Sequence, residues 1–447
     1  MKKQLLFLAG LIAAAPCSYA LDLVAAYQLA QKNDPTWQAN QLQYQVDQLN
    51  LGLAKGNLLP TVSISANITR KNQDIEKTAL TNFPGFESEN LMPATSTTKQ
   101  AVLTARQPLF RWDAWEGLKQ VKTSISLSEV NLRMQQQQHI LNTAQAYFNV
   151  LRQQALTSAH VQEEKALLEQ LNMMQAKLRE GLVARSEVSE AEAQYQNARA
   201  NRIAGQVQVL LAQEQLEQII GPYRENLAVL SQDFQFQKPY PEDLSAWQSL
   251  AQSQNLQLQQ ARLQQQYAQD AKRVEQAARL PQVEAVASYG YNKQSPSSVI
   301  ASDGQFDQVG VEVNWNAFNG GRTKINIEKA DVSVQKAMAD VEAASRKANT
   351  EVRKAYMQVE TDQAKLQARL IAMQSAQNVS NASQAQYREG LKNIVDVLLA
   401  QRNAFAAKQE YVNSQYDYLI NVLNLKAAIG QLTEDDLKQL NMWLVQK

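Results

Sequence analysis

Histidine and cysteine, two side chains that often carry catalysis or bind metal ions, are scarce in this chain of 447 residues. Its two histidines, His139 and His160, stand 21 positions apart in a stretch that is predicted to be helical. At about 1.5 Å of rise per residue, they would lie about 32 Å apart along one helix. They therefore cannot bind one metal ion within one chain, and a packed or solvated role on the helix is favoured for both.

No motif for nucleotide chemistry is present either. The phosphate-binding pattern GxxxxGK[ST] does not occur, and the pair Gly320-Gly321 before Arg322 more simply predicts a turn from strand to helix. The chain carries 44 basic and 43 acidic residues, and this near balance argues against a nucleic-acid partner. The sequence predicts no enzyme, no cofactor and no energy-coupling site.

The N-terminus predicts a secretory signal peptide over residues 1–20. Two lysines precede an apolar run from Leu5 to Ala15, and Ser18-Tyr19-Ala20 gives a small-x-small cleavage site. The run is too short for a membrane helix, which needs about 20 residues. A lipoprotein would carry its lipid on Cys17, the only cysteine, but Pro16 fits a lipobox poorly. Cleavage would leave 42 basic against 43 acidic residues and no cysteine, so stability would come from packing and assembly.

The chain repeats itself. Segments in the predicted helices of the first half occur again 209 residues later, and a segment beside the predicted strands occurs again 221 residues later. This pattern predicts a duplicated unit whose two copies differ in length between the strands and the helices. The matching segments are Arg179-Glu180-Gly181-Leu182 with Arg388-Glu389-Gly390-Leu391, Tyr147 with Tyr356, and Leu59-Pro60 with Leu280-Pro281.

Four short segments alternate apolar and polar residues and are predicted to be strands at about 60–70, 99–109, 281–292 and 306–316. Such alternation over about ten residues is typical of a strand with lipid on one face and water on the other. A half-buried sheet in a soluble domain is the alternative, which the signal peptide disfavours. Four strands cannot close a barrel, and lipid does not tolerate an open edge. Three chains would supply twelve strands.

Most other residues are predicted to be helical. Residues 112–179 contain no proline and one glycine, and their apolar positions follow the 3–4 spacing of a coiled coil. The predicted fold class is therefore mainly α with a membrane β-barrel part: long antiparallel coiled-coil helices, four strands per chain in a 12-stranded trimeric barrel, and an internal repeat. The predicted divisions after the signal peptide are a first repeat at 21–220, an irregular equatorial segment at 221–241, a second repeat at 242–429 and a C-terminal equatorial segment at 430–447.

These features resemble the TolC family of trimeric outer-membrane efflux and secretion ducts over nearly the whole mature length. The resemblance rests on the two Leu-Pro pairs, the two Gly-Leu turns, Ile394-Val395-Asp396-Val397 and the run from Tyr416 to Leu425. It implies a homotrimer in outer-membrane lipid of a Gram-negative bacterium, continued by a long periplasmic tunnel. The implied partners are a periplasmic adaptor (membrane fusion) protein and an inner-membrane pump of RND, ABC or MFS type.

The implied function is the exit duct of a tripartite efflux pump, of a type I secretion system, or of both. The duct would passively conduct drugs, small toxic compounds or proteins, and docking of the partners at its periplasmic tip would open it. The turns Gly181-Leu182 and Gly390-Leu391 match the family's adaptor-docking tips. A secreted coiled-coil structural protein or adhesin is the alternative.

The resemblance also implies a gate. Asp396 matches an aspartate of the tunnel-entrance ring, but Leu399 stands where well-known members have a second aspartate. The expected ring is therefore three carboxylates per trimer instead of six, and Leu399 could add an apolar ring.

Tyr387 and Lys392 match the latch between helical hairpins, with Ser186 and Glu187 as their partners on the other hairpin. Lys392 replaces the usual arginine. A point charge therefore replaces a forked contact, and the latch should be looser.

Overall fold

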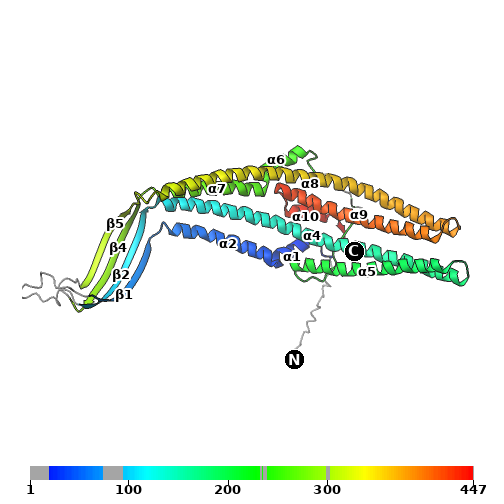
Figure 1. Cartoon of the computed structure of the whole chain (residues 1–447), viewed down its shortest axis with the longest axis horizontal. Helices are drawn as coiled ribbons and strands as arrows, with labels where there is room; N and C mark the ends of the chain where they lie inside the picture. Colours follow the sequence, from blue (N-terminus) through cyan, green and yellow to red (C-terminus); the bar gives the residue numbers. More distant parts are fainter. Residues whose placement is uncertain (1–19, 74–93, 232–233, 235–238, 298–302, 446–447) are drawn as a thin grey trace, which may run out of the picture. The chain divides into compact units, whose positions relative to one another are not determined.

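The structure, a computed structural model, describes residues 20–73, 94–231, 234, 239–297 and 303–445. All of the predicted signal peptide except Ala20 lies outside these residues. The chain is mainly helical (Figure 1). Its helices are α1 (Leu23–Asn33), α2 (Pro35–Gly56), α4 (Trp112–Arg179), α5 (Arg185–Ile220), α6 (Leu244–Gln254), α7 (Leu256–Ala277), α8 (Arg322–Arg388), α9 (Ile394–Ile429) and α10 (Glu434–Asn441). Its strands are β1 (Thr61–Asn72), β2 (Thr95–Phe110), β3 (Val229–Leu230), β4 (Gln282–Ser295), β5 (Gly304–Asn314) and β6 (Leu444–Val445).

The chain forms two compact units, and each takes segments from both sequence repeats. We call residues 1–41, 132–258 and 345–447 the hairpin unit, and residues 42–131 and 259–344 the sheet unit. The long helices α4 and α8 have residues in both units. No helix in the described part of the chain is long and apolar enough to cross a membrane.

The sheet unit contains an antiparallel sheet with the strand order β1-β2-β4-β5. Residues paired in register point to the same side, so the register separates two faces. One face is apolar and carries Val62, Ile64, Ile68, Leu103, Tyr289, Tyr291, Val309, Val311 and Val313. The other is polar and carries Ser63, Ser65, Asn67, Gln100, Thr104, Ser288, Asn292, Gln308 and Glu312. Val102, Val286 and Phe306 interrupt the polar face, and the residues that interrupt the apolar face include Lys99, Gln107, Lys293 and Asp307.

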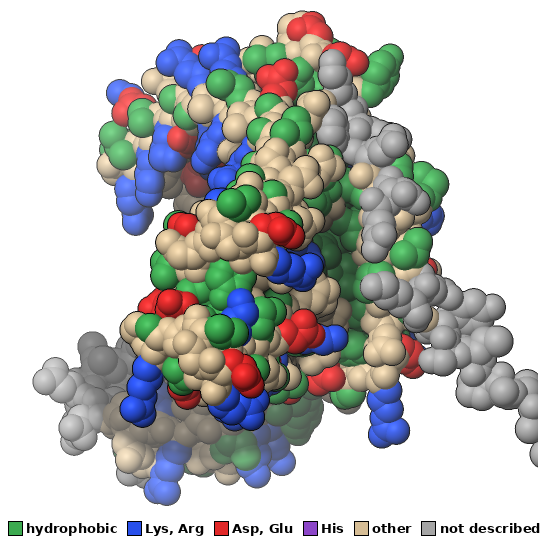
Figure 2. All heavy atoms as spheres, turned by 90° about the vertical axis from the view of Figure 1, so that its right-hand side faces the viewer, with side chains coloured by type: hydrophobic (Ala, Val, Ile, Leu, Met, Phe, Trp, Pro, Cys, Tyr) green, Lys and Arg blue, Asp and Glu red, His purple; other side chains and the backbone are tan. Residues whose placement is uncertain are grey.

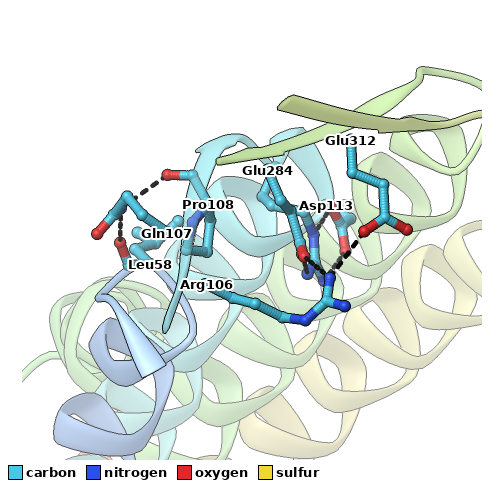
Figure 3. Close-up of polar contacts among 8 residues, drawn as sticks. Leu58, Arg106, Gln107, Pro108, Asp113, Glu284 and Glu312 are labelled. Carbon is cyan, nitrogen blue, oxygen red and sulfur yellow. Dashed lines mark hydrogen bonds and ion pairs between the residues drawn. The ribbon is translucent and has the colours of Figure 1, made fainter. Parts of the chain in front are cut away.

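A charged network crosses three strands at the helical end of the polar face (Figure 3). Glu284 of β4 and Glu312 of β5 are direct partners in register, and two like charges in that position repel. Arg106 of β2 offsets the repulsion, because its Nη1 lies 2.8 Å from Glu312 and 3.5 Å from Glu284. Arg111 adds a second cation 3.3 Å from Glu284. The network joins the strands of the first repeat to those of the second.

The repeat is visible in the elements themselves. Helices α5 and α9 each span 36 residues and begin 209 positions apart, at residues 185 and 394. Helices α1 and α6 begin 221 positions apart, at residues 23 and 244. Their N-caps are Asp22 and Asp243, whose side chains accept from the backbone N–H groups of Ala25 and Ser245. Both sequence offsets therefore correspond to repeated structure.

The main core lies in the hairpin unit, where α4, α5, α8 and α9 bury apolar side chains against the short helices α1, α6 and α10. Two repeat-related tyrosines anchor this region. The hydroxyl of Tyr147 lies 2.9 Å from the carbonyl oxygens of Leu21 and Ala228, and that of Tyr356 donates to the carbonyl of Glu242. Burial raises the pKa of Tyr147, which keeps the hydroxyl protonated as a donor.

Glycine is required where α9 meets the segment after α6. Gly430 ends α9 with φ +84°, and a Cβ there would lie 2.4 Å from the backbone carbonyl oxygen of Gln254. Gly390 has a similar φ of +74° but open space around it. Left-handed backbone costs a non-glycine residue about 1–2 kcal/mol, and overpacking adds about 1–3 kcal/mol.

We expect Gly430→Ala to lower the thermal unfolding midpoint more than Gly390→Ala does, because only Gly430→Ala combines strain with a clash. Circular dichroism of the two purified variants at matched detergent concentration measures the difference. Equal midpoints would mean that the contact with Gln254 relaxes without cost.

Candidate functional site at the hairpin tips

Two tight turns reverse the chain at one end of the hairpin unit (Figure 1). In the first, the N–H of Leu182 donates to Lys177 O and that of Gly181 to Leu178 O. The second repeats this pattern between Leu391 and Gln386 and between Gly390 and Tyr387. These are Schellman motifs, which need a left-handed residue, and Gly181 and Gly390 supply it with φ of 70° and 74°.

A small apolar core, here called the tip core, holds the two hairpins together behind these turns. It is built from α4, α5 and α9, with the partly buried Tyr387 of α8 packed against it. Its buried members are Leu167, Leu171, Met174, Val188, Ala191, Ala198, Ile394, Val397 and Leu398. The side chains that project from the tip are therefore placed by a packed scaffold. The exposed end carries acidic, basic and apolar side chains together (Figure 2).

Asp396 lies in the first turn of α9, where the buried neighbours Ile394 and Val397 fix the orientation of the helix. Its backbone N–H donates to the side chain of the N-cap residue Asn393 at 2.9 Å. The carboxylate itself is exposed, which is a favourable position for an acid at a helix N-terminus. Leu399 follows on the exposed side and keeps 47% of its surface accessible. Both candidate gate residues are therefore exposed on the surface of the single chain.

The four candidate latch residues lie at the tip, but the contacts within one chain run elsewhere. The Tyr387 hydroxyl accepts from Lys177 Nζ at 3.2 Å and lies 3.5 Å from Met174 Sδ, both on α4. Lys392 Nζ donates to Ser383 at 2.9 Å, on its own hairpin. Among the described residues, no hydrogen bond or ion pair joins either residue to the exposed Ser186 or the half-exposed Glu187.

Sequence reasoning missed two of these features. The Asn393 cap could have been found, because an asparagine three residues before an acid is a typical helix start. The contact between Lys177 and Tyr387 could not, because these residues are 210 positions apart and no local pattern links them.

The two histidines lie apart from the tip residues that the family resemblance singles out. His139 is buried, its Nδ1 lies 3.0 Å from Asp34, and its ring stacks on Trp37. His160 lies 3.4 Å from Glu163. No group of three or more metal-ligating side chains occurs in the described part of the chain. Both histidines serve helix packing here.

His139 should make stability depend on pH. Burial lowers its pKa below the usual value, and Asp34 only partly opposes this. Since the unfolded chain binds the proton more readily, the stabilisation is present above about pH 6.5 and is lost as the pH falls below it. We expect the unfolding midpoint of wild type to fall between pH 7.5 and pH 5 more steeply than that of His139→Gln. The matched variant His160→Gln leaves this site intact and should keep the wild-type slope; equal slopes in all three would contradict the assignment.

Comparison with solved structures identifies the fold. The Campylobacter jejuni CmeC outer membrane channel matches with a TM-score of 0.78, covering 94% of this chain and 89% of that chain at 17% identity. This chain shares the fold of that channel, which here consists of a four-stranded sheet with one polar and one apolar face and of long helical hairpins. The predicted fold class is confirmed.

The family follows from the sequence comparisons. A model described as outer membrane efflux protein matches residues 26–222 and 247–431, and the chain belongs to this family. Outer membrane protein TolC of Escherichia coli (strain K12) is 32% identical over 454 residues, covering 99% of this chain and 89% of that protein. Alkaline protease secretion protein AprF of Pseudomonas aeruginosa is 27% identical over 427 residues, covering 94% and 87%. The predicted resemblance and the outer-membrane location are confirmed.

Proposed function

We propose that three copies of this chain form an outer-membrane exit duct for efflux, for type I secretion, or for both. Drugs, small toxic compounds or proteins pass through it passively. A periplasmic adaptor connects the duct to an inner-membrane pump of RND, ABC or MFS type, and the pump supplies the energy for transport. Family membership supports the role as an exit duct. The type of pump is proposed from the resemblance alone.

The observation that carries the proposal is the open, two-faced sheet. Its outer strands β1 and β5 each pair with one neighbour among the described strands, and unpaired strand edges are not tolerated in lipid. A neighbouring copy can satisfy both edges by pairing β5 of one chain with β1 of the next. The apolar face then meets lipid, and the polar face lines a water-filled lumen.

The proposed gate lies at the tip. The exposed Asp396 and Leu399 of three chains would form one ring of carboxylates and one of leucines around the entrance. Tyr387 and Lys392, with Ser186 and Glu187 on the other hairpin, would latch the closed state, and Gly181-Leu182 and Gly390-Leu391 would receive the adaptor. Leu182 and Leu391 support the docking role, because they stay 71% and 77% accessible, and exposed apolar side chains favour a protein partner.

Membrane fractionation tests the duct against the structural alternative. A barrel protein stays in the outer membrane through washes with salt and alkali and is released by detergent, whereas a secreted coiled-coil protein or adhesin is washed off. Release by alkali would contradict the proposal. Deletion of the chain should also raise drug sensitivity if efflux is its task.

Asp396→Asn should reduce cation selectivity and weaken block by divalent cations added on the periplasmic side. Three carboxylates around one axis attract cations, and the amide removes that charge. Because Leu399 leaves only one such ring, we expect an effect of about twofold to fivefold in the inhibitory concentration, corresponding to roughly 0.4–1 kcal/mol. Planar-bilayer recordings measure it, with Glu389→Gln on the same hairpin as the control. Unchanged selectivity would mean that Asp396 does not line the pore.

A further inference from the structure

We propose that Lys177 is the residue by which the first hairpin holds Tyr387 of the second, and that this contact helps to keep the tip closed. The inference rests on the proposed gating function and adds to it a residue that the family pattern does not single out. The contact that Tyr387 makes within one chain is therefore with α4, whereas the expected partners Ser186 and Glu187 lie on α5.

The geometry gives Lys177 two attractive contacts with one side chain. Its ammonium nitrogen lies 3.2 Å from the Tyr387 hydroxyl oxygen and 4.4 Å from the centre of the ring. A cation within about 6 Å of an aromatic ring centre is attracted by the ring quadrupole. Both side chains are half-buried, so water screens the contact less than it would at a fully exposed site. Met174, which is fully buried, packs behind the hydroxyl at 3.5 Å.

The tip turn also fixes the position of Lys177. Its carbonyl oxygen accepts the 2.9 Å hydrogen bond from Leu182 that closes the first turn. The tip core immobilises Met174, one turn earlier on the same helix. The backbone of Lys177 is therefore held from both sides. Its side chain loses less conformational entropy on contacting Tyr387 than it would from a mobile backbone.

The contact distinguishes the two hairpins, although they are repeats of one another. At an offset of 209 residues, Lys177 corresponds to Gln386 and Tyr387 corresponds to Leu178. The first hairpin therefore supplies the cation and the second supplies the ring, and the reciprocal pair of glutamine and leucine cannot form the same contact. Lys392, in contrast, donates to Ser383 on its own hairpin. Lys177 is thus the cation that crosses between hairpins at Tyr387.

Planar-bilayer recordings of the purified full-length protein test this. Lys177→Met keeps the apolar stem and removes the cation, and we expect it to raise the open fraction by roughly 5- to 30-fold. Lys177→Arg retains a cation that can stack on the ring and should stay within about twofold of wild type. Arg179→Met removes an exposed charge two residues away and serves as the matched control.

A double-mutant cycle separates a direct contact from a general effect on the tip. In a Tyr387→Leu background, Lys177→Met should raise the open fraction no further, because the ring it contacts is already gone. Unfolding midpoints close to wild type for all variants would exclude a merely structural role. A Lys177→Met protein that gates like wild type, or full additivity with Tyr387→Leu, would overturn this inference. A wild-type protein that forms no channel at all would instead contradict the proposed function.

Discussion

Ile64→Lys should lower the amount of trimer in the outer membrane by at least about tenfold, because a lysine at the bilayer midplane of a membrane barrel costs about 2–4 kcal/mol. Ile64 is the fourth of the 12 residues of β1 and lies on the apolar face, where Leu103 and then Tyr289 continue its row across the sheet. Each barrel of three chains would carry the substitution three times. Heat-modifiable gel mobility of isolated outer membranes, with detection by an antibody, measures the folded trimer.

The adjacent residue provides the matched control. Ser65 lies on the polar face, opposite Val102, so Ser65→Lys should leave the amount of trimer near that of wild type. Ile64→Val should also be tolerated, since it keeps an apolar side chain on the lipid face. If Ser65→Lys is the harmful variant and Ile64→Lys is tolerated, the assignment of the two faces is reversed.

Tyr387→Phe combined with Lys392→Glu should open the tip in the absence of any partner. If the proposed latch forms in the trimer, each copy loses a hydrogen bond worth about 0.5–1.5 kcal/mol and a solvent-accessible charge contact worth about 0–1 kcal/mol. Three copies acting together would shift the closed–open equilibrium by a few kcal/mol, and about 1.4 kcal/mol is a factor of ten. We expect a single-channel conductance well above that of wild type and inward leakage of large antibiotics into cells.

A third substitution tests the charge pairing between the hairpins. Glu187→Lys added to the double variant restores opposite charges between the hairpins, and should return part of the closure if Lys392 and Glu187 face each other in the closed tip. Trimer stability should stay near wild type throughout, because Tyr387→Phe keeps the ring that packs against the tip core. A double variant that conducts like wild type would remove the latch assignment and make the Leu399 ring the better candidate for the gate.

The fold was predictable because its signals are periodic and local. Alternation in Val62, Ile64 and Ile68 predicts a two-faced strand, and the paired Gly-Leu turns predict where the long helices reverse. The short helices α1, α6 and α10 were not predicted as separate elements in this way. Their placement depends on long-range contacts, such as the hydrogen bond that the Tyr147 hydroxyl donates to the carbonyl oxygen of Leu21.

The candidate site was predictable only in part. The exposure of Asp396 and Leu399 agrees with a position on the entrance, but their role at the gate stays a prediction. The partner of Tyr387 could not be predicted, because the choice between α4 and α5 depends on how the tip core packs. A motif records which residues lie in a turn, whereas a contact across 210 positions depends on the tertiary structure.

The number of chains in the detergent-extracted particle tests the central claim most directly. Four strands with two open edges need other copies to close in lipid, and we infer three. Native mass spectrometry of the purified protein, released from its detergent micelle in the gas phase, counts the chains without reference to any assumed shape. The account predicts a mass of three mature chains. A monomer or a dimer as the membrane-extracted species would contradict it.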